Sequence, residues 1–268
     1  MNQDIGMMFE ELAHSQKFGR IHHRFLNDLQ KLSALLTHCD NDENYHEIAE
    51  GDLCWYEKHT GEMVLFMNHP LSFNRLPSYD RIEERLRAGN ITSLADVLDA
   101  DFGDIILAIE LKRGMGDSFR AIEQAVELLE EKAKNRYWID SFSPDLLRMV
   151  KSVNPSTPTS LHTRYGVYGK YVVINSWIPP FFGLLNLYQL EHVDAITVTR
   201  QYLPARFFRA CGVETNHLYR HVIGSGKKLL FGGLTTEKTF LEVQASSAIA
   251  GYKKWGTEFE KPLTMTYE

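Results

Sequence analysis

Apolar residues recur along the chain in two alternating patterns: short runs with the two-residue period of a strand, and longer stretches with the period of a helix. The short runs predict strands at 21–24, at 45–56 with an extension at 63–68, and at 104–112, 137–142, 158–163, 194–199, 227–233 and 248–253. Strands that alternate with helices over about this length favour an α/β fold of the (β/α)8 TIM-barrel type. A doubly wound open sheet is the rival arrangement.

Amphipathic stretches between these runs predict the helices. The clearest spans 117–135, where Phe119 and Leu129 belong to one apolar stripe. The sequence Ser143-Pro144-Asp145 begins another helix, with a cap residue and a proline at the first helical position. Further helices are expected at 4–18, 28–38 and 92–98. Because no linker interrupts the pattern, we expect one barrel domain over 1–268, preceded within that range by the N-terminal helix at about 4–18.

The most apolar part of the chain, 171–190, is not expected to span a membrane, because it contains Asn175, Asn186 and the Pro179-Pro180 pair. Within it, the run 172–190 is expected as a half-buried helix of the barrel. Alternatively, it forms an apolar lip that contacts lipid peripherally or meets another subunit. The oligomeric state stays open.

Composition narrows the class of protein. The 268 residues are 44% hydrophobic and 24% charged, as in an ordinary globular protein, and the formal net charge of −6 argues against a nucleic-acid partner. Three scattered cysteines without a CxxC pair indicate reduced thiols. With no signal-peptide pattern at the N-terminus, these features predict a cytoplasmic protein.

Two pairs of charged residues stand at the ends of neighbouring predicted strands. Glu50 and Asp52 end one apolar run, and Glu110 and Lys112 end the next. Residues two apart on a strand share a face, so each pair points one way. Three carboxylates and one ammonium at adjacent strand ends suit one hard divalent cation, Mg²⁺ or Ca²⁺, and a phosphate.

Two histidines and an arginine fall at the same ends of the strands. His23-Arg24 follows the first strand, and His69 follows the extension of the second. One histidine would attack or remove a proton, and the other would protonate the leaving alcohol. Arg24 and Lys112 would bind the phosphate oxygens. His22 also precedes this turn, and we favour His23 as the catalytic one.

In this order, His-Arg, Glu-x-Asp, His and Glu-Leu-Lys resemble the motifs of the glycerophosphodiester phosphodiesterase family. The resemblance continues in 91–98 and 141–147 and covers most of 21–235. It implies a barrel phosphodiesterase with a small-molecule substrate and one divalent cation. It implies Glu50, Asp52 and Glu110 as metal ligands, His23 and His69 as the catalytic pair, and Arg24 and Lys112 as phosphate contacts.

The chain departs from that family after His-Arg, where the family has a glycine and then Pro-Glu-Asn-Thr. Here Phe25-Leu26-Asn27-Asp28-Leu29 resembles the sphingomyelinase D-type phospholipases instead. This departure implies a substrate different from that of the family, such as a sugar phosphodiester of the agrocinopine type. It also leaves open a lyase or synthase in which a substrate hydroxyl attacks and a cyclic phosphate forms. A non-catalytic barrel that binds a sugar phosphate is the third alternative.

Later strands offer weaker candidates for the substrate pocket. They are His162, Arg164, Arg200 and Phe231. Phe231 would contribute by stacking or apolar contact, and ordinary packing or exposure is the alternative for each.

Overall fold

The computed structural model describes residues 9, 12, 18–38, 45–69, 77–112, 114–133, 135–163, 167–168, 171–177, 180–199, 222, 224–232 and 251–254. Within these residues, no helix is both long enough and apolar enough to cross a bilayer. Cys54 is buried and carries a free thiol, whereas Cys39 and Cys211 lie outside the described part of the chain.

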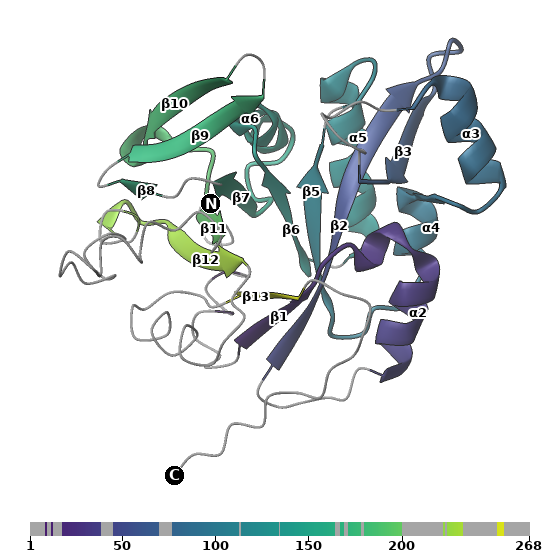
Figure 1. Ribbon diagram of the computed structural model, residues 1–268, viewed down its shortest axis with the longest axis horizontal. Coiled ribbons are helices and arrows are strands. Elements are labelled where there is room, and N and C mark those ends of the chain that lie inside the picture. The colour runs from purple at the N-terminus through teal and green to yellow at the C-terminus, as the bar shows by residue number, and fades with distance from the viewer. Residues whose placement is uncertain are drawn as a thin grey trace.

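Eight strands lie side by side and parallel in one sheet (Figure 1). They are β1 (Phe18–His22), β2 (Tyr45–Glu57), β5 (Ile106–Leu111), β6 (Tyr137–Ser141), β7 (Thr159–Thr163), β11 (Ala195–Thr199), β12 (Lys228–Gly232) and β13 (Gly251–Lys254). Their order is β12-β11-β7-β6-β5-β2-β1-β13, and each neighbouring pair is parallel. The strands expected from the apolar runs are confirmed, with small shifts at their ends.

The strands neighbour one another in chain order, and the last, β13, pairs with the first, β1. A doubly wound sheet reverses its strand order near the middle, and this sheet does not. The edge strands β12 and β13 contact each other, but no ladder of hydrogen bonds joins them among the described residues. An α/β fold with a mostly parallel sheet is therefore confirmed. Closure of the barrel, and a single domain over 1–268, stay predictions.

Helices cover the outer face of this sheet. They are η1 (Phe25–Asn27), α2 (Leu29–His38), α4 (Leu94–Leu98), α5 (Ser118–Lys132), α6 (Pro144–Val153) and η2 (Leu187–Gln189). The remaining helix, α3 (Tyr79–Arg87), packs against Tyr56 and Phe66 instead. The largest apolar cluster joins α2, α4, α5 and α6 to the strand residues that point outward, such as Ala49, Leu107 and Ile139. The amphipathic stripe predicted for α5 is confirmed at Leu129, which is buried, but not at Phe119, which is exposed at the first turn.

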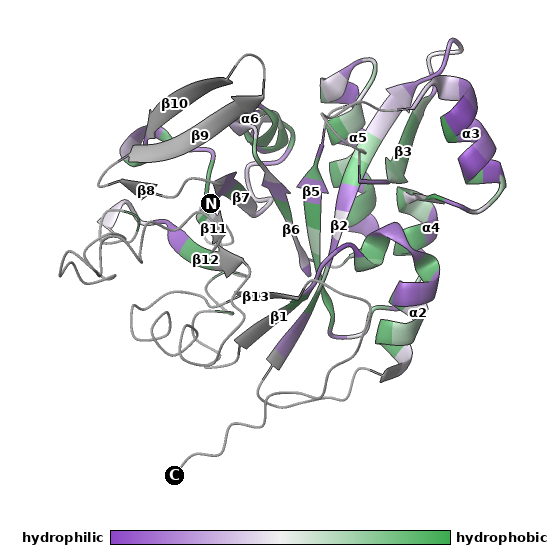
Figure 2. Ribbon diagram, viewed as in Figure 1, coloured by the Kyte–Doolittle hydropathy of each residue, from purple (hydrophilic) through white to green (hydrophobic). Residues whose placement is uncertain are grey.

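A second apolar cluster fills the opposite, inner face. It holds Ile21, Ile48, Ile106, Ala108, Trp138, Ala195 and Leu230, together with Phe9 and Leu12. Phe9 and Leu12 are helical, and the rest of the helix predicted at 4–18 lies outside the described residues except Phe18, which begins β1 instead. Residues two positions further along these strands share this inner face. On β5 the polarity changes along the strand: Figure 2 shows it hydrophobic along most of its length and hydrophilic near its end.

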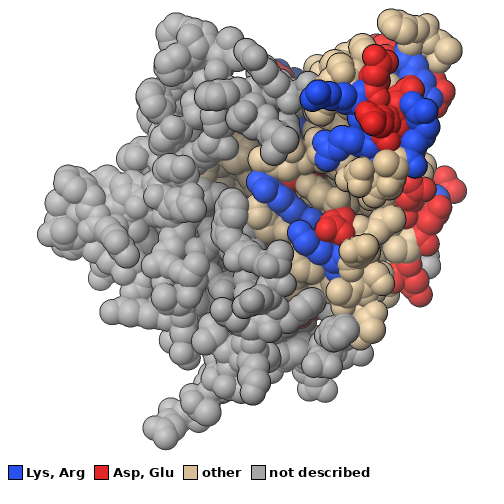
Figure 3. Space-filling model, turned by 45° about the vertical axis from the view of Figure 1, so that its right-hand side comes forward, with Lys and Arg blue, Asp and Glu red and all other residues tan. Residues whose placement is uncertain are grey.

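The end of β2 continues as a hairpin with β3 (Met63–Met67), which also pairs with β4 (Thr92–Ser93). A third apolar cluster with Tyr56 and Phe66 packs this extension against Ile82 of α3. The other side of α3 is solvated. Figure 3 shows its acidic and basic side chains interspersed, so this surface carries no single sign of charge.

The prediction of a helix at 172–190 is wrong. The chain forms a small antiparallel sheet of β8 (Val167–Tyr168), β9 (Tyr171–Trp177) and β10 (Pro180–Asn186). The β-branched run in β9 favours a strand, and Pro179-Pro180 interrupts any helix. Side chains of 171–185 are not described, so the peripheral lipid contact stays a prediction.

Gly51 is required where η1 packs against β2. A Cβ atom at this position would lie 2.5 Å from Leu26 Cβ and 2.6 Å from Met67 Cε. We expect Gly51→Ala to lower the free energy of unfolding by about 1–3 kcal/mol, because a packed neighbour must move. Urea denaturation followed by circular dichroism measures this.

The matched control is Gly224→Ala. There a Cβ atom would lie 3.5 Å from the Tyr188 hydroxyl oxygen, an ordinary contact, so stability should stay near that of the wild type. Equal stability of the two variants would contradict the tight packing at Gly51.

Candidate active site

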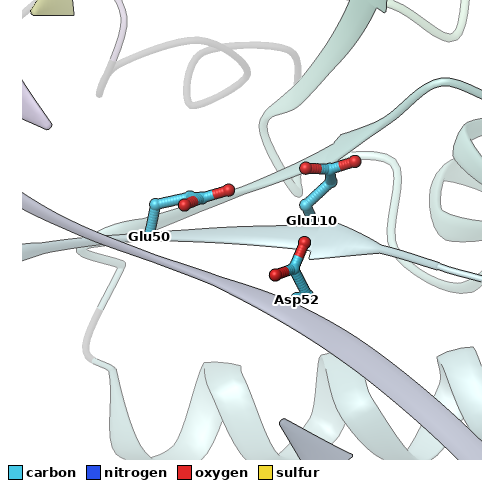
Figure 4. A group of neighbouring side chains, drawn as sticks. All are labelled: Glu50, Asp52 and Glu110. Carbon is cyan, nitrogen blue, oxygen red and sulfur yellow. The ribbon is translucent and has the colours of Figure 1, made fainter. Parts of the chain in front are cut away.

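Three buried carboxylates converge on the inner face of β2 and β5. The parallel register places Asp52 opposite Glu110, and Glu50 lies two residues before Asp52 on the same face. Glu50 and Glu110 are each 2% exposed and Asp52 is fully buried. One oxygen from each lies within 4.8 Å of the others, and Figure 4 shows the three carboxylates close together. The predicted convergence of the acids is confirmed.

His23 reaches this cluster from the turn after β1. Its Nδ1 contacts Glu50 Oε2, and the backbone N–H of Arg24 donates to the same oxygen at 2.8 Å. Arg24 has a φ of 62°, in the left-handed region that non-glycine residues seldom adopt. Such a conformation costs about 1–3 kcal/mol and persists where surrounding contacts determine it. Here it turns the amide of Arg24 toward Glu50.

His22 points the other way. Its Nε2 lies 2.6 Å from Glu47 Oε2, and its ring packs beside Phe25. Glu47 and Glu50 are an odd number of residues apart on β2, so they project from opposite faces of the strand. Of the two histidines, His23 is therefore the one that contacts the acid cluster.

Lys112 sits just beyond β5 and pairs with two of the acids. Its Nζ lies 2.9 Å from Asp52 Oδ1 and also contacts Glu110 Oε1. Burial by itself would lower the pKa of Lys112, but the carboxylates of Glu110 and Asp52 outweigh it and raise the pKa above its ordinary value. Lys112 therefore carries a positive charge at any physiological pH.

Asp52 is held by two further residues from the turn after β1. Arg24 Nε lies 3.7 Å from Asp52 Oδ2. Asn27 Nδ2 donates to that oxygen at 2.8 Å, and the backbone N–H of Asp52 donates to Asn27 Oδ1 at 2.8 Å. Asn27 was not among the predicted site residues, because an amide in a turn carries no periodic signal.

His69 follows β3 and enters the same region. The N–H of its neighbour Asn68 donates to the Asp52 carbonyl oxygen at 2.8 Å, which ties this segment to β2. Burial lowers the pKa of His69, and the nearby charges of Asp52 and Arg24 act on it in opposite directions. The neutral imidazole is favoured.

Of the four weaker candidates for the substrate pocket, only His162 has a side chain that the structure describes. His162 is 4% exposed on the inner face of β7, and its Nε2 lies 3.3 Å from Asp140 Oδ1. Arg164 and Arg200 lie outside the described residues, and Phe231 belongs to β12 but its side chain is not described.

Asp140 is a site residue that sequence reasoning missed. It stands opposite Glu110 on β6, is 3% exposed, and accepts a hydrogen bond from Trp138 Nε1 at 2.8 Å. The sequence nevertheless contains a pattern that could have indicated Asp140. An acid follows an apolar residue by two positions at the end of a strand, as on β2 and β5.

The chemistry of the acid cluster fits a divalent cation. Carboxylate oxygens are the ligands of hard cations. The three carboxylates face the cationic side chains of Lys112 and Arg24, so the acids outnumber these two cations by one. Like charges buried close together repel one another, and a divalent cation held by Glu50, Asp52 and Glu110 would offset that repulsion.

No sequence-family profile matches the chain, and no curated protein matches it by sequence. Its fold, however, matches solved structures. A Silicibacter pomeroyi protein described as a glycerophosphoryl diester phosphodiesterase is 14% identical, with a TM-score of 0.59 over 92% of this chain and 93% of that one. A glycerophosphodiester phosphodiesterase from Agrobacterium tumefaciens is 14% identical, with a TM-score of 0.55 over 88% and 96%.

A third structure is an Oleispira antarctica phosphodiesterase in complex with the product sn-glycerol-3-phosphate. It is 13% identical, with a TM-score of 0.58 over 90% of this chain and 94% of that one. The resemblance to the glycerophosphodiester phosphodiesterases, first indicated by the order of motifs, is thus confirmed for the fold.

The Lys112 charge network yields a prediction for stability. Lys112→Met leaves Asp52 and Glu110 buried without their ammonium partner. We expect the metal-free protein, measured in chelator, to lose about 3–5 kcal/mol of unfolding free energy. Added Mg²⁺ or Ca²⁺ should raise the melting temperature of the variant more than that of the wild type.

The control is Lys58→Met, which removes an ion pair with Glu62 in which both side chains are partly exposed. Such pairs contribute less than about 1 kcal/mol. If the two variants were equally stable in chelator, the network around Lys112 would not hold the site together.

The lowered pKa of His69 predicts a pH dependence of stability. Between its ordinary pKa of about 6.5 and its lower value in the folded protein, the unfolded chain takes up a proton that the folded one does not. The free energy of unfolding should therefore fall as pH drops through this window. His69→Gln should remove that part of the slope in urea titrations with chelator, whereas His59→Gln, at an exposed turn, should keep it. Identical slopes in both variants would exclude the assignment.

Proposed function

We propose that this protein is a divalent-cation-dependent phosphodiesterase that cleaves a small glycerophosphodiester or sugar phosphodiester. The observation that carries the proposal is the buried group of Glu50, Asp52 and Glu110, paired with Lys112 and contacted by His23. The fold shared with known phosphodiesterases supports it.

The phosphate would bind between cationic side chains at the ends of β1 and β5. Lys112 and Arg24 both lie against Asp52, with side chains 13% and 36% exposed, so each can also contact a ligand. A divalent cation, Mg²⁺ or Ca²⁺, held by the three carboxylates, would neutralise charge on the phosphoryl oxygens.

The two histidines would transfer the protons. His69, neutral because burial lowers its pKa, would accept the proton of the attacking hydroxyl or water as the new bond to phosphorus forms. His23 would donate a proton to the leaving alcohol as its bond to phosphorus breaks. Glu50, in contact with His23 Nδ1, orients that imidazole with its Nε2 away from the carboxylate.

The substrate we propose carries glycerol or a sugar, including diesters of the agrocinopine type. The Oleispira antarctica phosphodiesterase of similar fold holds sn-glycerol-3-phosphate as its product, which supports a small polyol phosphate.

A second candidate is a lyase or synthase in which a hydroxyl of the substrate attacks phosphorus and a cyclic phosphate forms. The observation that favours it is Asn27, which makes two hydrogen bonds to Asp52 from the segment that resembles sphingomyelinase D-type phospholipases. Both reactions use the same acids and histidines. A barrel that only binds a sugar phosphate is the third possibility.

The purified protein should cleave one of a set of glycerol, choline, lysolipid and sugar phosphodiesters when Mg²⁺ or Ca²⁺ is present. Chelation should abolish turnover, and Glu110→Gln should lower kcat/KM by a factor of roughly 10³ or more, because a ligand and a partner of Lys112 are lost. The control Glu123→Gln, at an exposed position of α5, should retain wild-type activity.

Phosphorus NMR of the products separates the candidates. A phosphomonoester supports hydrolysis, a cyclic phosphate supports the lyase reaction, and metal-dependent binding without turnover supports the binding protein. Full activity in chelator would rule out the proposed site.

A further inference from the structure

The inner face of β6, β7 and β11 is polar where the face of a barrel is usually apolar. Asp140, Ser160, His162 and Thr197 are all at most 5% exposed there, above the apolar layer that includes Trp138 and Ala195. Polar groups buried this deeply cost free energy unless they are paired or serve a ligand. Ser160 and Thr197 pair with each other, Oγ to Oγ1 at 2.6 Å. Asp140 and His162 remain to be explained.

Asp140 is anchored by one oxygen and faces His162 with the other. Oδ2 accepts the hydrogen bond from Trp138 Nε1. Oδ1 lies 3.3 Å from His162 Nε2, is itself buried, and accepts no hydrogen bond of good geometry from the described residues. The carboxylate thus lies within ion-pair distance of one ring nitrogen of His162. Among the described residues, no hydrogen bond to the other ring nitrogen, Nδ1, is formed.

This pair adjoins the acid cluster without belonging to it. Asp140 stands opposite Glu110 in the parallel register, yet the group of acids whose oxygens lie within 4.8 Å of one another is Glu50, Asp52 and Glu110. A role as a further ligand of the same cation is therefore not supported for Asp140.

The strand register relates His162 to Lys112. His162 lies two residues beyond Ser160, which stands opposite Asp140, and Lys112 lies two residues beyond Glu110. The ring of Phe142 lies between them, with its centroid 5.8 Å from Lys112 Nζ and 5.0 Å from the His162 ring centroid. A phosphate at Lys112 would consequently extend its alcohol across Phe142 toward His162.

We propose that His162, which lies beside Asp140, is a specificity-determining residue that binds a hydroxyl group of the substrate's alcohol. A hydroxyl suits this position because it can donate to a neutral Nδ1 or accept from a protonated one. The spacing across Phe142 places that hydroxyl a few carbons away from the phosphate. This inference rests on the proposed phosphodiesterase function and adds the chemistry that selects its substrate.

The test compares sn-glycero-3-phosphocholine with propyl phosphocholine, which lacks both glycerol hydroxyls. The wild type should prefer the glycerol ester by roughly 10- to 100-fold in kcat/KM, the worth of a hydrogen bond to a buried polar group. His162→Ala should bring this ratio close to one, and His162→Asn, which keeps a donor, should retain part of it. Asp140→Ala should lower the ratio as well, because the imidazole loses the carboxylate beside it.

The ratio is measured within each variant, so it separates recognition from a general loss of folded protein. His59→Ala, at an exposed turn, is the control and should keep the wild-type ratio. An unchanged ratio in His162→Ala, or no preference in the wild type, would overturn the proposal. An unchanged ratio in Asp140→Ala would remove Asp140 from it.

If the wild type cleaves no diester of the set named above, the proposed function fails, and calorimetry with Mg²⁺ or Ca²⁺ present still tests the recognition. Tighter binding of sn-glycerol-3-phosphate than of propyl phosphate, with the difference lost in His162→Ala, would support it. Equal binding of the two by the wild type, or no binding of either, would refute it.

Discussion

The pairing of Lys112 with Asp52 and Glu110 inside the sheet is the interaction on which the rest of the site depends. Two acids from neighbouring parallel strands share one ammonium, and both are almost completely withdrawn from water. Such a group is stable only where counter-charges and hydrogen bonds surround it. The structure supplies Asn27 and Arg24 beside Asp52, and His23 beside Glu50.

Two local features of the backbone support this arrangement of buried charges. Arg24 adopts a left-handed conformation that brings its backbone N–H to Glu50. Gly51, the residue between Glu50 and Asp52 in the sequence, has no side chain and so allows the turn after β1 to lie against β2. Together they place His23 beside the acids while His22, one residue earlier, is held by Glu47 on the opposite face.

The inner face divides into two chemical halves. The strands β1, β2 and β5 carry the acids, Lys112 and His23, which suit a metal-bound phosphate, whereas β6, β7 and β11 carry uncharged hydroxyls and the Asp140–His162 pair. Phe142 contacts Lys112 on one side and His162 on the other. This division agrees with the substrate proposed above, which has a charged centre and a hydroxylated arm.

The sequence by itself determined the order of the parallel strands and the face on which Glu50, Asp52 and Glu110 lie, because strand periodicity and parallel register follow from local pattern. It also indicated the family whose fold the chain shares. Only the tertiary structure decided between His22 and His23, brought Asn27 to Asp52, and made β9 and β10 a hairpin rather than a helix. Those outcomes depend on contacts between segments 25 residues apart, or on pairing across a turn, and no periodicity within one segment encodes them.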